Sequence, residues 1–118
     1  VGIGTDLVEI ARVEKACEKQ AFLSRIYTQE ERRQAGERAL KLSGDFAVKE
    51  AVAKALGTGF RKFMPVDIEV LRDELGKPYV ILHGEARRLS KELGVTQIHV
   101  SISNEKEYAL AYVVAEGM

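Results

Sequence analysis

Hydrophobic positions in the first half of the chain follow mainly the spacing of helices. Residues 1–8 are apolar and punctuated by glycine, which predicts a strand that leads into a turn or a helix start. Apolar residues then recur at helical spacing from residue 9 to about residue 19. Residues 28–42 open with an N-cap threonine and place acidic residues before basic ones, which suits a helix dipole. The alanine-rich residues 44–56 predict a further helix that ends at a glycine.

The second half of the chain is patterned mainly for strands. Residues 66–82 form two alternating segments around a turn sequence and predict a hairpin, and an amphipathic helix follows over residues 84–93. Strands are predicted at residues 97–103 and 108–115. Helices and hairpins are segregated rather than alternating, so we expect an α+β fold with a mainly antiparallel sheet packed against helices. One domain is expected over residues 1–118.

Composition excludes some classes of function. The chain has 118 residues, with 18 basic and 18 acidic side chains, so it lacks the basic excess of a nonspecific nucleic-acid binder, although a local basic patch is compatible with this balance. Cys17 is the only cysteine, which excludes a secreted disulfide scaffold. No apolar run approaches the roughly 20 residues that span a bilayer. A cytoplasmic location is therefore expected.

Asp6 lies where the first predicted strand ends, and two roles are open for it. Aspartate is a preferred N-cap residue, so capping of the following helix is favoured by residue type alone. The alternative is a carboxylate ligand that faces a cleft.

Glu50 and Lys54 share one face of the predicted 44–56 helix with phenylalanine and alanine. They could form a surface ion pair at i,i+4 spacing, worth about 0.3–0.5 kcal/mol, or line a cleft of small residues. Their spacing leaves both interpretations open. Together with Asp6 they could form a site for a hard cation, since Mg²⁺ prefers carboxylate, water and phosphate oxygens. A lysine would then neutralise the same phosphates as a point charge.

The glycines and the proline near the predicted turns are typical of ordinary turn chemistry. Gly57 follows the predicted 44–56 helix, and Gly76, Lys77 and Pro78 lie in the turn of the predicted hairpin. The alternative is that Lys77 and exposed backbone amides there contact an anionic ligand. The sequence offers no nucleophile–histidine–acid arrangement.

Four segments, in this order, resemble the holo-acyl-carrier-protein synthases, the small class of 4′-phosphopantetheinyl transferases. They are I-G-T-D-L-V-E-I-A-R-V-E (3–14), F-A-V-K-E-A-V-A-K-A-L-G-T-G (46–59), D-E-L-G-K-P-Y (73–79) and H-V-S-I-S-N-E-K-E-Y-A (99–109). The resemblance covers nearly the whole chain. Its most specific part is a G-x-D segment followed, about forty residues later, by F-x-x-K-E-A-x-x-K.

The resemblance implies a Mg²⁺-dependent group transfer in fatty acid biosynthesis, on a phosphopantetheinyl transferase fold. A serine hydroxyl of apo acyl carrier protein would attack the β-phosphorus of coenzyme A, accept the 4′-phosphopantetheine group and release 3′,5′-ADP. By this resemblance Asp6 and Glu50 are catalytic and hold Mg²⁺. Lys54 is catalytic by balancing phosphate charge. A nearby base or a water accepts the serine proton, and Glu50 is one candidate for that base.

The resemblance also implies partners. Coenzyme A would contact Lys54, Gly57, Gly76, Lys77 and Pro78, in clefts between the subunits of a homotrimer. The acidic acyl carrier protein would dock on basic residues in the first part of the chain, because opposite charges steer such encounters. The expected docking residues are Arg12 and Arg25.

Two positions depart from the family pattern. Asp45 stands at a position where a basic residue is common in this family. That basic residue is thought to contact a phosphate of coenzyme A. Either another cation, Lys41 or Lys49, is expected to replace it, or the affinity for the adenosine end is altered. Asn104 stands where some members have histidine, and it is assigned no catalytic role.

Two alternative functions stay open from the residues alone. A small α+β module that binds RNA would show exposed aromatic and basic side chains on its strands, but the basic residues lie mainly on predicted helices. A Mg²⁺-dependent nucleotide hydrolase would use the same carboxylates.

Overall fold

A computed structural model describes residues 1–117. Within this range, strands β1 (Gly2–Glu9), β5 (Tyr108–Gly117) and β4 (Val95–Asn104) form an antiparallel sheet in that order. Strands β2 (Ile68–Arg72) and β3 (Pro78–Leu82) pair as a separate antiparallel hairpin. The predicted α+β class with antiparallel strands packed against helices is confirmed, although its strands belong to two sheets.

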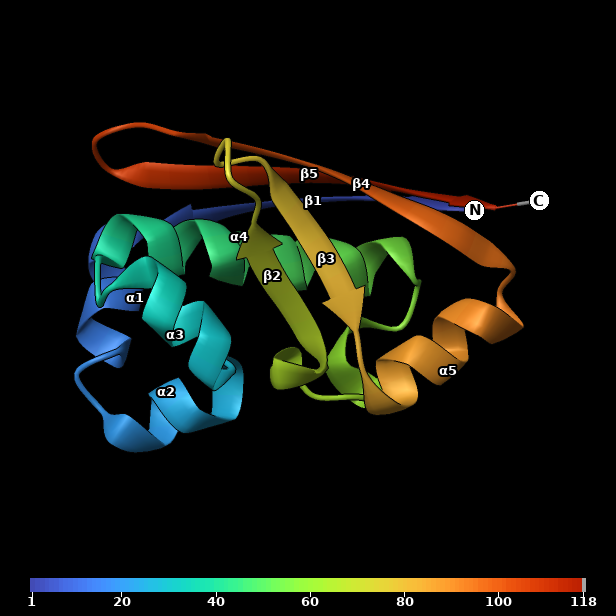
Figure 1. The fold of residues 1–118 in the computed structure, drawn as a ribbon, viewed down its shortest axis with the longest axis horizontal. Helices are drawn as coiled ribbons and strands as arrows, with labels where there is room; N and C mark the ends of the chain where they lie inside the picture. Colours follow the sequence, from blue (N-terminus) through green and yellow to red (C-terminus); the bar gives the residue numbers. More distant parts are fainter. Residues whose placement is uncertain (118) are drawn as a thin grey trace.

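The helices are arranged around one long central helix. Helices α1 (Ile10–Ala16), α2 (Gln20–Ile26) and α3 (Gln29–Ala35) gather at one end of the molecule, and α5 (Gly84–Glu92) lies at the other (Figure 1). The central α4 (Ala39–Ala55) runs beneath the three-stranded sheet, and the β2–β3 hairpin crosses its other side. In the part of the chain that the structure describes, no helix is both long and apolar enough to cross a membrane.

The helix predicted at residues 28–42 is wrong, because α3 ends early. Thr28 and Glu31 form a capping box in which the Glu31 N–H donates to Thr28 Oγ1 (3.1 Å) and the Thr28 N–H donates to Glu31 Oε1 (2.8 Å). Gly36 then adopts a left-handed conformation with φ 58°, which ends the helix as a C-cap. As a result α4 begins at Ala39, five residues earlier than predicted, and α2 was not predicted at all.

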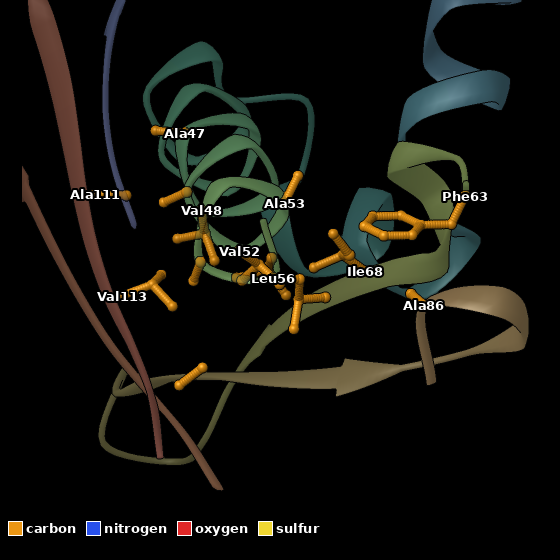
Figure 2. Packing of buried hydrophobic residues seen from close by; sticks show 14 residues of the cluster. Ala47, Val48, Val52, Ala53, Leu56, Phe63, Ile68, Ala86, Ala111 and Val113 are labelled. Carbon is orange, nitrogen blue, oxygen red and sulfur yellow. The ribbon is translucent and has the colours of Figure 1, made fainter. Parts of the chain in front are cut away.

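The main hydrophobic core is built on both sides of α4. Val48 and Val52 are fully buried, with Ala111 and Val113 of β5 on one side of the helix and Ile68 of β2 on the other (Figure 2). A helix that is apolar nearly all round is typical of a buried position. Its burial fixes the positions of the few polar side chains that α4 carries.

One ion pair is completely buried beside this core. The Lys49 ammonium donates to Glu31 Oε1 (2.9 Å) and to the carbonyl oxygens of Pro65 (3.1 Å) and Ile68, while Glu31 Oε2 accepts the Val70 N–H (2.8 Å). Both side chains have zero exposure, and each charge is hydrogen bonded, which a buried pair requires. The expectation that Lys49 replaces a basic residue at position 45 is therefore wrong, because its ammonium cannot contact a ligand.

Candidate active site

Strand β1 and helix α4 cross in direct backbone contact. A Cβ atom at Gly4 would lie 1.8 Å from the carbonyl oxygen of Ala51, and one at Gly2 would lie 2.0 Å from that of Ala55. Only residues without a side chain permit this approach. Side chains at positions i, i+2 and i+4 of a strand share a face, so Asp6 lies on the same face as the two glycines. The crossing therefore directs Asp6 toward α4.

Asp6 contacts Lys54 across this crossing. Asp6 Oδ1 lies 3.1 Å from the Lys54 ammonium, which also donates to the carbonyl oxygen of Thr5 (2.9 Å). The Lys54 side chain is 53% exposed, so a ligand can also contact it. The N-cap prediction for Asp6 is wrong, because Asp6 lies inside β1 and the N-cap residue of α1 is Glu9.

Glu50 lies one turn before Lys54 on α4 and is half-buried. Partial burial raises the pKa of its carboxyl group, the nearby charge of Asp6 raises it further, and Lys54 opposes both effects. Within residues 1–117, Lys54 forms its ion pair with Asp6 and not with Glu50, so the surface-pair interpretation of Glu50 and Lys54 is wrong. The charge of Asp6 thus acts on the Glu50 carboxyl group, as expected of side chains that share one site.

A cleft of about 470 Å³ opens over these side chains, between β1, α1, α2 and α4. Asp6, Glu50 and Lys54 line it, together with the stacked rings of Phe22 and Phe46, whose centroids are 6.2 Å apart. The cleft thus combines carboxylates and an ammonium group with an apolar wall. This is the usual make-up of a small-molecule site.

The residues in this cleft fit a magnesium ion that takes part of its ligands from water and substrate. Among residues 1–117 there is no cluster of three or more histidine, cysteine, aspartate or glutamate side chains that could hold a metal by itself. Asp6 and Glu50 offer only carboxylate oxygens. This donor set suits Mg²⁺, which is commonly bound by one or two carboxylates and completed by water and substrate phosphates.

The structure does not bring the other residues expected to bind coenzyme A into this cleft. Gly57 follows the end of α4 and is exposed, with φ 85°. Gly76, Lys77 and Pro78 lie at the tip of the β2–β3 hairpin, where Gly76 and Pro78 line a different cleft with Asn104. Their predicted contacts with coenzyme A stay predictions.

The two residues expected to dock the carrier protein are exposed. Arg12 lies on α1 and lines the Asp6–Glu50 cleft, while Arg25 lies in the last turn of α2. Their docking role stays a prediction.

Sequence reasoning missed two residues that line clefts. Phe22 belongs to α2, whose apolar Phe22, Leu23 and Ile26 have helical spacing that could have revealed it. Arg72 forms an ion pair with Asp45, with Nη1 2.6 Å from Oδ1. No periodic signal connects these two positions, which lie 27 residues apart.

Residues 2–113 match the family model described as the 4′-phosphopantetheinyl transferase superfamily. The chain belongs to this superfamily. A holo-[acyl-carrier-protein] synthase of Lachnoclostridium phytofermentans is 56% identical over 115 residues, which cover 98% of this chain and 94% of the relative. The synthase of Clostridium novyi is 46% identical over 120 residues, covering 98% of this chain and 87% of the relative.

Solved structures of holo-[acyl-carrier-protein] synthases share the fold. The Neisseria meningitidis synthase superimposes with a TM-score of 0.88 at 40% identity, covering 98% of this chain and 97% of that one. The Helicobacter pylori synthase, solved in complex with coenzyme A, gives a TM-score of 0.87 at 30% identity, covering 97% and 99%. The predicted enzyme class, a holo-[acyl-carrier-protein] synthase among the 4′-phosphopantetheinyl transferases, is confirmed.

Proposed function

We propose that this enzyme transfers the 4′-phosphopantetheine group of coenzyme A to a serine of apo acyl carrier protein in a Mg²⁺-dependent reaction of fatty acid biosynthesis, releasing 3′,5′-ADP. The observation that carries the proposal is the presence of Asp6, Glu50 and Lys54 in one cleft of a phosphopantetheinyl transferase fold. The complex of the Helicobacter pylori relative with coenzyme A supports the choice of donor. The cytoplasmic location stays a prediction.

Phosphoryl transfer depends mainly on alignment and on neutralisation of charge, rather than on covalent chemistry by the protein. Asp6 and Glu50 would hold Mg²⁺, which supplies Lewis-acid charge at the pyrophosphate when bound. The half-exposed ammonium of Lys54 can exchange its contact with Asp6 for a phosphate oxygen. A nearby base or a water accepts the proton of the attacking serine.

An exposed apolar face of the three-stranded sheet supports the proposal of a homotrimer. Leu7 of β1 and Leu110 of β5 are paired across the strands and are 61% and 42% exposed, and Ile3 and Tyr112 extend the same apolar face. Contiguous exposed apolar patches mark interfaces. We propose that this face forms the contacts between subunits, so that the hairpin tip of one subunit can approach the Asp6–Glu50 cleft of the next.

Electrostatic docking completes the proposal. Arg12 is exposed near the opening of the Asp6–Glu50 cleft. Arg25 is exposed on α2. We propose that they contact the acidic acyl carrier protein and guide its serine toward the bound coenzyme A.

A mass measurement tests the proposal. The enzyme is incubated with coenzyme A, Mg²⁺ and apo carrier protein, and the carrier should gain the mass of one phosphopantetheine. Asp6→Asn and Glu50→Gln should abolish the gain while leaving the fold intact, because each removes a charged oxygen from the cleft. Glu92→Gln, at an exposed glutamate of α5, is the matched control and should behave like the wild type.

Three results would contradict the proposal. Release of inorganic phosphate with no change in the carrier would indicate a nucleotide hydrolase, and no reaction at all would indicate a binding module. Near-normal turnover of Asp6→Asn or Glu50→Gln would show that the assignment of the metal ligands is wrong.

A further inference from the structure

The apolar wall of the Asp6–Glu50 cleft is supported from behind by a residue outside the cleft. Phe22 of α2 and Phe46 of α4 form the wall, and both are half-buried, so each ring is partly open to a ligand. Tyr27 follows α2 directly, is 2% exposed and does not line the cleft. It belongs to a small core, separate from the main one, against which both phenylalanines pack.

Tyr27 supports both members of the wall. Its ring meets that of Phe22 edge to face, with centroids 6.3 Å apart and an interplanar angle of 68°. Its hydroxyl donates to the carbonyl oxygen of Leu42 (2.8 Å), one helical turn before Phe46 on α4. One buried side chain thus joins α2 to α4 and sets where the two phenylalanine rings meet.

The Tyr27 ring is held in one orientation. Besides the hydrogen bond at its hydroxyl, it has the Lys49 ammonium 5.6 Å from its centroid, within the range of a cation–π contact. That ammonium is itself fixed by Glu31. Helix α2, in contrast, has seven residues and no side-chain hydrogen bond at its N-cap, and such short helices depend on tertiary packing. The place of Phe22 therefore depends on Tyr27.

The wall and the phosphate-binding lysine lie at opposite ends of one row on α4. Phe46 precedes Glu50 by four residues, and Lys54 follows Glu50 by four. Residues four apart are neighbours on a helix face, so the three side chains form a row with Glu50 in the middle. The wall is therefore at the end of the cleft away from Lys54.

The expected docking residue for the carrier protein lies at the same end as the wall. Strand β1 passes Ala55 at Gly2 and Ala51 at Gly4, so it runs toward the start of α4. Helix α1 continues from β1 in this direction, and its Arg12 lines the cleft. A carrier that contacts Arg12 therefore meets the wall.

We propose that Tyr27 is a positioning residue that holds the Phe22–Phe46 wall in place to receive an apolar surface of the carrier protein. The inference rests on the proposed function, under which Arg12 docks the acidic carrier. Charge steers the encounter, whereas a wall that is already fixed adds a short-range contact at little cost in conformational entropy. Tyr27 acts through the wall and touches no substrate itself.

Transfer kinetics of Tyr27 variants test the inference. Tyr27→Leu removes the ring behind Phe22 and should raise KM for the carrier about threefold to tenfold, the equivalent of one aromatic pair, with kcat and KM for coenzyme A unchanged. Tyr27→Phe keeps the ring and should behave nearly as the wild type. If Tyr27→Leu does not fold, Tyr27→Met replaces it, because methionine fills the same space without a ring.

A second aromatic pair provides the matched control. Phe63 is 5% exposed, meets Phe60 edge to face at 5.8 Å and lies in the main core with Ile68, outside the cleft lining (Figure 2). Phe63→Leu should lower the free energy of unfolding about as much as Tyr27→Leu does, but should leave KM for the carrier unchanged. An equal rise in KM for the carrier in both variants would assign the effect to lost stability and overturn the inference.

Phe22 tests whether Tyr27 acts through the wall. Phe22→Leu should raise KM for the carrier, and adding Tyr27→Leu to it should raise KM little further, because the effects of side chains that act as one unit are not additive. Effects that multiply in the double variant would overturn the inference. So would an unchanged KM in Phe22→Leu, or a Tyr27→Leu effect on coenzyme A in place of the carrier.

Calorimetric titration with apo carrier protein, without coenzyme A, separates this inference from the proposed function. Tyr27→Leu should bind the carrier more weakly by the same factor as its rise in KM, while Tyr27→Phe and Phe63→Leu should bind it as the wild type does. If the wild type binds the carrier but transfers nothing, the proposed function fails and the affinities of the variants still decide the inference. If the wild type does not bind the carrier, the inference is overturned.

Discussion

The contact between β1 and α4 predicts a large effect from a very small substitution. Gly4→Ala would place a Cβ atom 1.8 Å from the carbonyl oxygen of Ala51, whereas ordinary contacts begin at 3.4 Å. The strand and the helix would have to separate by about 1.6 Å, the difference between the two distances. Because the obstructing atom belongs to the backbone of a buried helix, rotation of a side chain cannot relieve the overlap.

The free energy of unfolding should fall by about 1–3 kcal/mol or more, the range for overpacked cores. Activity should fall further than stability alone would cause, because Asp6 lies two residues along the same face of β1. A displacement of about 1 Å in a reacting group can reduce the rate about 10²-fold. We therefore expect folded Gly4→Ala protein to transfer phosphopantetheine at least about 10²-fold more slowly than the wild type.

Urea unfolding at a fixed protein concentration, combined with the carrier mass assay, measures both effects. Gly44→Ala is the matched control, since the nearest atom to its new Cβ is Ile102 Cγ2 at 3.2 Å, a side-chain atom that can move. Alanine also has a helix propensity about 1 kcal/mol better than glycine, so this control should be no less stable than the wild type. If Gly4→Ala unfolds and turns over like the wild type, the crossing does not position the site.

Four further outcomes follow from the structure. Lys54→Met should lower the transfer rate about 10²-fold, and an unchanged rate would exclude charge neutralisation by this lysine. Lys49→Met should lower the unfolding free energy by about 3–5 kcal/mol in urea titrations, because it leaves Glu31 buried without its cation, and a loss below 1 kcal/mol would contradict this account. The pKa of Asp45 in the folded protein, about 7, lies above its ordinary value because the side chain is buried, so protonation of Asp45 stabilises the fold fully below about pH 4 and this contribution is lost as the pH rises through 7. The unfolding free energy of Asp45→Asn, measured between pH 4 and 8, should lack that decline. A decline identical to that of the wild type would assign it to other groups. Arg12→Glu should raise KM for the carrier protein with little change for coenzyme A, whereas an equal rise for both would refute the docking role.

Those parts of the fold that depend on residues close together in the sequence were predictable from it. The β2–β3 hairpin and α5 follow from their alternation and helical period, and Thr28 was recognised as the N-cap of α3. The end of α3 was missed because the acid-to-base order of residues 28–42 continues through Gly36, whose left-handed conformation interrupts the helix. The early start of α4 depends on packing against other elements, which local propensity does not contain.

The candidate site, too, was predictable from the sequence only where it depends on residues of one element. Spacing on α4 identified Glu50 and Lys54 as side chains of one helix face but could not separate a surface pair from a cleft. Asp6 was assigned to the same site only through the resemblance to a family. Its position in space depends on the crossing of β1 over α4 at the two glycines. The pairing of Asp45 with Arg72 joins two elements that no sequence period relates, so only the structure could reveal it.

The buried lysine of α4 has a consequence for how the protein comes apart. Its ammonium is held at once by a carboxylate of α3 and by two carbonyl groups at the entrance to β2. Detaching either neighbour alone would strand an ion in a medium that cannot solvate it. These segments, distant in sequence, must therefore open together as a single cooperative unit.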